Sequence, residues 1–294
     1  MKNYLSLIKF SHTIFAMPFA LVGFILGVYE SQSSFDWRIL VAVVLCMVFA
    51  RNAAMAFNRY LDRDIDAKNP RTVVREIPAG VIKPSSALFF VIINCLLFIA
   101  TTWFINMLCF LLSPVALLII LGYSFTKRFT FLCHFVLGLG LALAPLGAYL
   151  SVVGHFAILP ILFSFIVLLW VSGFDIIYAL QDVDFDKSLN LSSVPVRLGR
   201  KGALQLSNVL HFLSALFMTI TVWILYTAQR TPSGEGGVFG ILNALGASAF
   251  IGLLYYQHTL VKPNDLSKVN MAFFTTNGIA SVIYGSFFIL DYLF

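Results

Sequence analysis

The chain has 294 residues, of which 60% are hydrophobic and only 11% are charged, and its mean hydropathy is +0.92. A soluble domain carries about 25% charged residues, so this composition excludes a soluble globular protein and predicts an integral membrane protein. The net charge of +6 does not indicate nucleic-acid binding, because the basic residues are distributed as membrane topology requires.

Nine apolar stretches are long enough to cross a bilayer as helices, which takes about 20 residues each. The first follows a basic N-terminus but lacks a small-residue cleavage site, so we expect a retained helix and not a signal peptide. The third and fourth are separated only by a short turn within TTWFINMLCF. The stretches cover residues 12–29, 38–58, 85–104, 107–124, 129–150, 157–178, 204–226, 238–258 and 270–291.

The loops between these stretches differ in their basic residues. With nine helices, the N-terminus and one set of loops hold sixteen Lys and Arg residues, whereas the opposite loops hold only Arg38 and Arg230. Positive charge marks the cytoplasmic side, so we expect the N-terminus and the charged loops in the cytoplasm, at a bacterial-type inner membrane. The four cysteines lie singly in apolar stretches, which favours structural cysteines over disulfides or zinc.

A cluster of charge, NRYLDRDIDAKNPRT, ends the second apolar stretch. Asn58, Asp62 and Asp66 are spaced four residues apart and therefore share one stripe of a helix. Asp64 points elsewhere. Arg51 lies seven residues before the first of them, about 10 Å deeper at a rise of 1.5 Å per residue.

A second acidic cluster, YALQDVDFDKSLNLSSVPVRLGRKG, ends the sixth apolar stretch. Asp182 and Asp186 each follow their counterparts in the first cluster by 120 residues. Asp175 and Tyr178 continue the same helical face inward, and Gln181 flanks it.

The matched spacing indicates an internal repeat. We expect an all-α fold of about nine transmembrane helices around a central cavity, in one domain over residues 1–294. Two four-helix halves, about 1–128 and 129–260, would be followed by a ninth helix. Both acidic clusters end even-numbered helices, so they lie on the same side of the membrane and can face each other across the cavity.

Carboxylates this close repel one another unless a cation lies between them. Mg²⁺ prefers one or two carboxylates together with water and phosphate oxygens, so the two clusters predict a magnesium-bound diphosphate. An excess of nearby basic residues suits that anion, because Arg pairs with phosphate oxygens. A solvated membrane flank explains single loop cations but not two matched Asp stripes. The basic residues are Lys68, Arg71, Arg75, Lys127, Arg128, Arg197 and Lys201.

These clusters resemble the motifs of the UbiA superfamily of intramembrane prenyltransferases, and the resemblance spans the whole chain. NRYLDRDID is similar to the first family motif, N-x-x-x-D-x-x-x-D. DVDFDKSLNLSSVP is similar to the second, D-x-x-x-D followed by S-x-P. RTVVREIPAG and YSFTKRFTFLCHFVLG are supporting segments. Asn190 departs from the pattern, because relatives often have Gly at this position.

The resemblance implies a helical bundle that binds Mg²⁺ and a polyprenyl diphosphate at its cytoplasmic side. Lys127 and Arg128 match a family pair implied in diphosphate contact. The implied metal ligands are Asn58, Asp62, Asp66, Asp182 and Asp186.

Within the superfamily, YLSLIKFSHTIFAMPFALVGFILG and RNAAMAFNR look most like the 4-hydroxybenzoate polyprenyltransferase group. The implied reaction attaches a prenyl group to a ring carbon of a small aromatic acid, in ubiquinone or menaquinone biosynthesis. Arg51 matches a family Arg associated with the carboxylate of that acceptor.

We expect the acidic motifs to be catalytic together with two further side chains. Tyr178 would face an allylic carbocation, and Asp175 or Asp182 would remove the ring proton. The expected substrate-binding residues are Arg51, Asn58, Lys68, Arg71, Arg75, Lys127, Arg128, Gln181 and Arg197.

Other interpretations stay open. A secondary transporter of a small organic anion also combines repeats with intramembrane charge, but such sites lie near the midplane and not at helix ends. An Mg²⁺-dependent alcohol phosphotransferase would carry a D-G-x-x-A-R element, which the chain lacks. Arg51 is alternatively an internal partner of Asp175. His134 lies where relatives often have Gln, which leaves a polar role at the cavity open.

Overall fold

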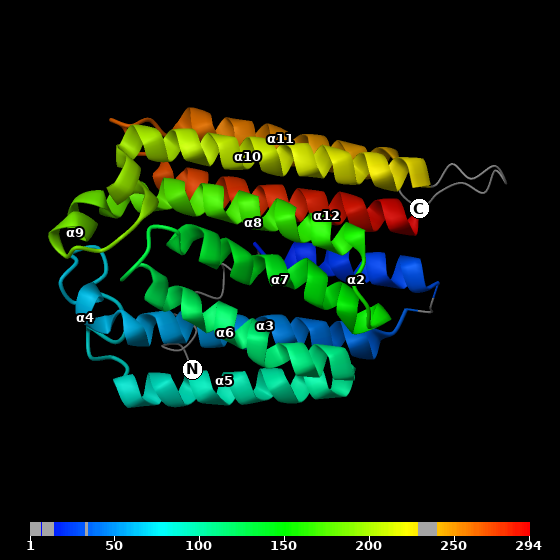
Figure 1. Ribbon diagram of the computed structural model, residues 1–294, viewed down its shortest axis with the longest axis horizontal. Coiled ribbons are helices and arrows are strands. Elements are labelled where there is room, and N and C mark those ends of the chain that lie inside the picture. The colour runs from blue at the N-terminus through cyan, green and yellow to red at the C-terminus, as the bar shows by residue number, and fades with distance from the viewer. Residues whose placement is uncertain (1–6, 8–14, 33–34, 229–239) are drawn as a thin grey trace.

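The computed structural model describes residues 7, 15–32, 35–228 and 240–294. Within these ranges the fold is helical and contains no named strand. The long helices run side by side along one direction, and two short helices, α4 and α9, lie together at one end of the bundle (Figure 1). We call this end the α4/α9 end.

The sequence order of the helices follows the predicted apolar stretches. The long helices are α2 (Met17–Ser31), α3 (Trp37–Leu61), α5 (Pro84–Ile105), α6 (Met107–Thr126), α7 (Cys133–Val153), α8 (Ile158–Ala179), α10 (Val194–Ala228), α11 (Ile241–Leu260) and α12 (Asn277–Leu293). The short elements are α4 (Arg63–Asp66), the 3₁₀ turn η2 (Leu180–Asp182), α9 (Val183–Ser188) and the π-helical η3 (Met271–Thr276), which continues into α12.

Seven helices of the described chain are long and apolar enough to cross a membrane. They are α3, α5, α6, α7, α8 with its extension, α10, and η3 with α12. The described part of α2 is apolar but has only 15 residues, and α11 is not among the seven. The predicted stretches 12–29 and 238–258 begin outside the described residues. An integral membrane protein is therefore supported, whereas the count of nine spans stays a prediction.

The turn predicted between the third and fourth stretches is a single residue, Asn106. Its side chain accepts a hydrogen bond of 2.8 Å from the backbone N–H of Cys109, which caps the first turn of α6. Its amide also donates to the carbonyl of Leu150 at 2.8 Å, near the end of α7. One polar side chain thus ends α5, starts α6 and ties both to a third helix.

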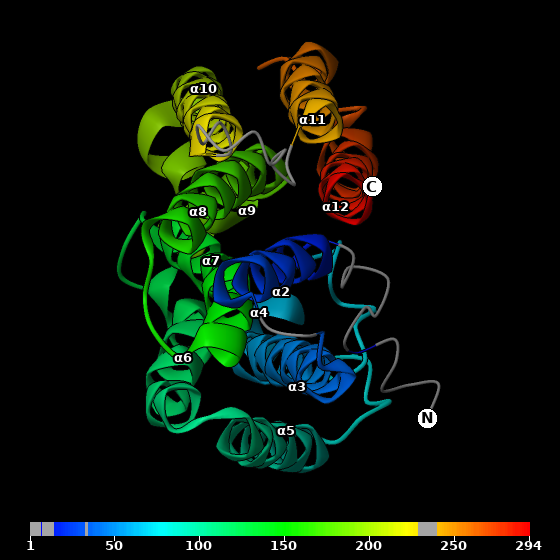
Figure 2. The ribbon, with the colours of Figure 1, turned by 90° about the vertical axis from the view of Figure 1, so that its right-hand side faces the viewer.

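Helices α2, α7 and α8 pack against one another in the middle of the bundle. In the end-on view of Figure 2, α10, α11 and α12 lie on one side of them and α3, α5 and α6 on the other. The core between α2, α8, α11 and α12 is aromatic. Phe19 lies 5.5 Å from Trp170 and 5.7 Å from Tyr284, measured between ring centroids. The Trp170 indole donates to Asn277 at 2.8 Å, which fixes α8 against α12.

Close packing of α2 on α7 depends on Gly23. A Cβ added at this position would lie 2.0 Å from the carbonyl oxygen of Pro145, so Gly23→Ala must push the two helices apart. We expect the free energy of unfolding to fall by about 1–3 kcal/mol, the usual cost of overpacking. Thermal unfolding of the two proteins in the same detergent measures the loss.

Gly147→Ala is the matched control, because a Cβ on this α7 residue meets nothing within 4 Å. Its melting temperature should equal or slightly exceed that of the wild type, because Ala stabilises a helix interior relative to Gly by about 0.5–1 kcal/mol. Equal melting temperatures for the Gly23 and Gly147 variants would contradict close α2–α7 packing.

Candidate active site

The first acidic motif keeps its predicted stripe, although the helix changes direction at Asp62. The backbone N–H of Asp62 bonds to the carbonyl of Asn58 at 2.9 Å, and that of Asp66 bonds to the carbonyl of Asp62 at 2.7 Å. The Asn58 amide also donates to the Asp62 carboxylate at 2.9 Å. The Asp64 side chain, by contrast, is 82% exposed. The three stacked residues therefore face one compartment, as the spacing predicted.

The second acidic motif does not form the continuous helical stripe that the spacing predicted. Helix α8 ends at Ala179, Asp182 lies on the 3₁₀ turn η2, and Asp186 lies on the separate helix α9. The chain then turns at Asn190, whose φ is +54°. This left-handed conformation favours Gly and is tolerated by Asn. Asn190 can therefore form the turn although relatives often have Gly at this position.

Arg71 joins the two acidic motifs across the compartment. Its Nε donates to Asp182 at 3.1 Å and its Nη1 donates to the Tyr178 hydroxyl at 3.0 Å. Its guanidinium carbon also lies 5.4 Å from the centroid of the Tyr178 ring. Asn69, from the same loop, donates to Asp182 at 3.4 Å. The loop that follows the first motif is thus bound to the second.

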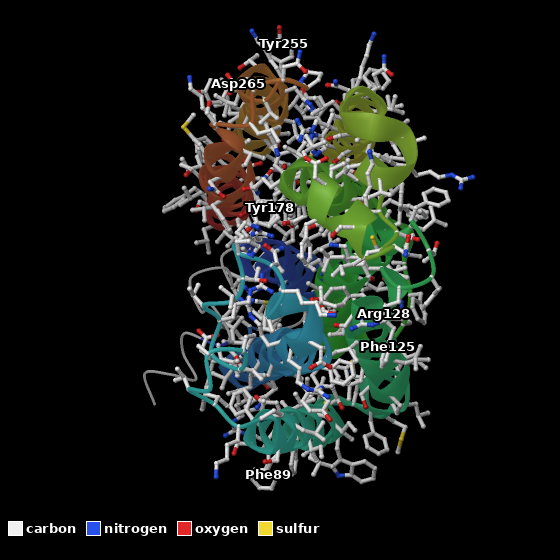
Figure 3. The ribbon with its side chains drawn as sticks, turned by 90° about the vertical axis from the view of Figure 1, so that its left-hand side faces the viewer. Phe89, Phe125, Arg128, Tyr178, Tyr255 and Asp265 are labelled. Carbon is white, nitrogen blue, oxygen red and sulfur yellow. The ribbon has the colours of Figure 1, made fainter. Side chains whose placement is uncertain are left out.

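Two consecutive residues after α6 make a second link. The Arg128 guanidinium lies 2.8 Å from the carboxylate of Asp62, and the Lys127 ammonium lies 2.7 Å from that of Asp186. Lys127 also interacts electrostatically with Asp62, so this pair of neighbouring residues faces a carboxylate of each motif. Figure 3, viewed from the α4/α9 end, shows Arg128 and Tyr178 at the middle of this face. The two motifs share one compartment.

Burial strengthens the ion pairs of this compartment. Both carboxylate oxygens of Asp66, which is 5% exposed, bind Arg75 at 2.7 and 2.8 Å. Asp186 is fully buried beside Lys127. Burial raises the pKa of the Asp62 carboxyl above its ordinary value, and Arg128 opposes that shift. Each of the four motif carboxylates is therefore paired with one basic side chain.

Three predicted substrate-binding residues have no contact with the acidic motifs in the described part of the chain. Lys68 is exposed. Arg197 is exposed and lies 5.7 Å from the centroid of the Phe131 ring. The Gln181 amide donates to the carbonyl of Tyr178 within its own helical turn. Their roles stay predictions.

An apolar cavity of about 380 Å³ lies between α3, α5, α6 and α7, and its wall includes Tyr123, which interacts electrostatically with Asp62. Along α3 its lining runs from Val43 to Met55, about 18 Å at the helical rise. Arg51 and Tyr123 are polar members of a mostly aliphatic wall. The volume is within the range of ligand pockets, about 300–1,000 Å³. An elongated apolar ligand with a polar head at the acidic motifs would suit this shape.

Asp175 is held by His134. The His134 Nδ1 lies 2.6 Å from the Asp175 carboxylate, and the backbone N–H of Val194 donates to His134 Nε2 at 3.4 Å. Because Nε2 accepts, Nδ1 carries the proton and donates to Asp175. His134 therefore orients Asp175, and the alternative pairing of Asp175 with Arg51 stays a prediction.

Two residues of this compartment were not predicted from the sequence. Tyr123 lines the cavity and interacts electrostatically with both Asp62 and Asp175. Its position four residues before Lys127, on the same helical face, was a signal for it. Asn69 had no signal, because it lies in a loop without periodicity.

The arrangement has counterparts among known proteins. A 4-hydroxybenzoate octaprenyltransferase from Aliivibrio fischeri (strain MJ11) is 31% identical over 256 residues, which cover 85% of this chain and 82% of that protein. The apo structure of a UbiA homolog from Aeropyrum pernix K1 matches with a TM-score of 0.82 and 29% identity, over 95% of this chain and 98% of that one. A UbiA homolog from Archaeoglobus fulgidus, bound to GPP and Mg²⁺, shares the fold with a TM-score of 0.74 and 20% identity, over 99% and 100% of the two chains. The model of the UbiA prenyltransferase family matches residues 16–279. The chain therefore belongs to the UbiA prenyltransferase family.

Proposed function

We propose that this chain transfers a polyprenyl group from a prenyl diphosphate to a ring carbon of a small aromatic acid, with Mg²⁺ as cofactor. One observation carries the proposal: the consecutive residues Lys127 and Arg128 each bind a carboxylate of one acidic motif, beside an apolar cavity with Tyr123 in its wall. The names of the relatives, 4-hydroxybenzoate octaprenyltransferases, support an aromatic acid as acceptor.

The residues of the compartment suit Mg²⁺. Their oxygen donors are carboxylates and one amide, the ligand types that Mg²⁺ takes alongside water and phosphate. Among the described residues no group of three or more His, Cys, Asp or Glu side chains is placed to hold a metal ion, so the proposed site needs phosphate oxygens and water to complete the coordination. The residues that would hold it are Asn58, Asp62, Asp66, Asp182 and Asp186. When bound, Mg²⁺ neutralises the diphosphate and makes it a better leaving group.

The basic side chains are placed to bind the diphosphate. Arg71, Arg75, Lys127 and Arg128 each touch a carboxylate of the motifs. A magnesium-bound diphosphate supplies both signs of charge, so cations can bind the carboxylates while Arg and Lys bind the phosphate oxygens. When the carboxylates exchange their basic partners for metal cations and the basic side chains bind phosphate instead, positive and negative charges in the compartment stay nearly equal.

The apolar cavity would hold the prenyl chain and exclude water from the reacting carbon. Cleavage of the C–O bond to diphosphate leaves an allylic cation, and water would convert this cation to an alcohol. The Tyr178 ring is fixed by stacking on Phe273, with 4.1 Å between ring centroids. A fixed aromatic face can stabilise a cation by about 0.5–2 kcal/mol. A ring carbon of the acceptor then forms the new C–C bond, and its proton leaves to a base.

Arg51 is proposed to bind the acceptor's carboxylate, because it lines the cavity below the acidic motifs. We expect Arg51→Ala to raise the KM for the aromatic acid roughly 10- to 100-fold, the effect of losing a charged hydrogen bond. The KM for the prenyl diphosphate should stay unchanged. Initial rates measured while each substrate is varied in turn separate the two effects.

Arg38→Ala is the control for this variant, because Arg38 is an exposed residue at the opposite end of α3. An unchanged KM for the acid in Arg51→Ala would move the acceptor site elsewhere.

The function itself is tested with membranes that contain the chain. Mg²⁺, a long-chain prenyl diphosphate and ring-labelled 4-hydroxybenzoate should give a ring-prenylated product and free diphosphate, and EDTA should abolish both. Uptake of the acid into vesicles without product would favour a transporter instead.

We further propose that nine helices span the membrane and that the α4/α9 end faces the cytoplasm of an inner membrane. The basic loops gather at this end, and positive loops stay cytoplasmic. Labelling of single introduced cysteines from each side of sealed vesicles tests the orientation.

A further inference from the structure

Arg59 is a buried arginine inside the first acidic motif to which the proposed reaction gives no role. It follows Asn58 on α3 and is only 4% exposed. Its Nε and Nη1 atoms are shielded from solvent and have no hydrogen-bond partner. Across the described ranges, no carboxylate forms an ion pair with it, whereas Arg71 and Arg75 each have one.

The surroundings of Arg59 place it in the layer of the acidic motifs. Asp66 and Tyr123 are among the groups that interact with it electrostatically. It lies three residues before Asp62, about 4.5 Å deeper along the helix and about 60° around it. It also lies four residues after Met55, which lines the apolar cavity, and residues four apart share a face.

A buried guanidinium without a bound anion is unfavourable, because it has lost its hydration and gained no hydrogen bonds in return. Two carboxylates, Asp66 and Glu76, interact with it electrostatically, but in the described structure neither forms an ion pair with it, and both oxygens of Asp66 are bound by Arg75. An anionic ligand that enters the compartment would accept hydrogen bonds from these unpaired N–H groups.

We propose that Arg59 binds a phosphate oxygen of the prenyl diphosphate. This inference rests on the proposed function and adds a binding residue to the same site. The phosphate is favoured over the acceptor's carboxylate because of depth: Arg59 lies beside the acidic motifs, eight residues or about 12 Å above Arg51. A planar guanidinium at that level can form two parallel bonds to one phosphate group.

Direct binding tests the proposal without turnover. The full-length chain in detergent is titrated with a non-hydrolysable prenyl thiolodiphosphate in the presence of Mg²⁺, and the dissociation constant is measured by calorimetry. We expect Arg59→Gln to weaken binding roughly 10- to 100-fold, as for the loss of a charged hydrogen bond. Arg59→Lys keeps the positive charge but cannot form two parallel bonds to one phosphate group, so it should give an intermediate affinity.

Stability provides a second readout. Because Arg59 makes no internal hydrogen bond through its buried atoms, Arg59→Gln should melt at the same or a higher temperature than the wild type when no ligand is added. The rise in melting temperature on addition of the thiolodiphosphate and Mg²⁺ should shrink in parallel with the affinity.

Arg63→Gln is the matched control. Arg63 belongs to the same motif but contacts the Tyr60 carbonyl and Asp64, and its replacement should leave binding unchanged. The proposal is overturned if Arg59→Gln binds the probe as tightly as the wild type, if it weakens only the aromatic acid, or if it melts well below the wild type without ligand. A wild-type chain that does not bind the probe with Mg²⁺ would instead contradict the proposed function.

Discussion

Asp62→Asn is expected to lower kcat/KM for the prenyl diphosphate on the order of 10³-fold, as the loss of a buried electrostatic contact to the leaving group does. Asn58 and Arg128 both contact this carboxylate, and it is a proposed ligand of Mg²⁺. The amide keeps the shape of the side chain but removes the charge that holds the cation. Initial rates over a range of Mg²⁺ concentrations measure the loss, and high Mg²⁺ should restore part of it.

Asp64→Asn removes the same charge from the same motif and is the control. Its side chain is 82% exposed and lies 3.9 Å from Arg63. We expect its rate to stay within about twofold of the wild type, since exposed substitutions have small effects. Equal and small losses in both variants would mean that the motif is only a solvated membrane flank.

The spacing of the acidic motifs predicted their shared compartment because helical geometry fixes which residues share a face. The backbone hydrogen bonds that stack Asn58, Asp62 and Asp66 persist through the change of helix at Asp62. The offset of 120 residues predicted that the two motifs would lie near each other, and the consecutive residues Lys127 and Arg128 bind one carboxylate of each.

The long-range partners could not be predicted, because period and spacing describe one helix at a time. Asn69 and Asp182 are 113 residues apart in sequence, and His134 bonds to Asp175 through packing of α7 on α8. The break between α8 and α9 likewise depends on tertiary contacts. The burial of Arg59 also could not be predicted, because it depends on contacts with segments far away in the sequence.

A basic residue close to an acidic motif in sequence does not by itself predict a contact with that motif. Lys68 and Arg197 were predicted to bind substrate, and the structure places both on the surface. Topology alone requires Lys and Arg in these loops, so a basic residue near a motif does not indicate a contact. The bases that touch the motifs are Arg71 and Arg75 from the loop after α4, and Lys127 and Arg128 directly after α6.

Asp175→Asn is expected to lower kcat by roughly 10²- to 10⁴-fold, the usual contribution of a positioned general base. After the C–C bond forms, the ring carbon still carries its proton, and a carboxylate must take it to restore aromaticity. His134 donates to one oxygen of Asp175 and orients the group. The KM for the prenyl diphosphate should not change, because Asp175 contacts none of the proposed diphosphate ligands.

An acceptor deuterated on its ring distinguishes a lost base from a distorted site. In Asp175→Asn, proton removal becomes the slow step, so the deuterated acid should react more slowly than the ordinary acid, whereas the wild type should show no difference. His134→Gln is the control, because its amide can still donate to Asp175, and it should retain most of the activity. If Asp175→Asn loses activity without an isotope effect, its carboxylate does not remove the ring proton, and Asp182 becomes the candidate base.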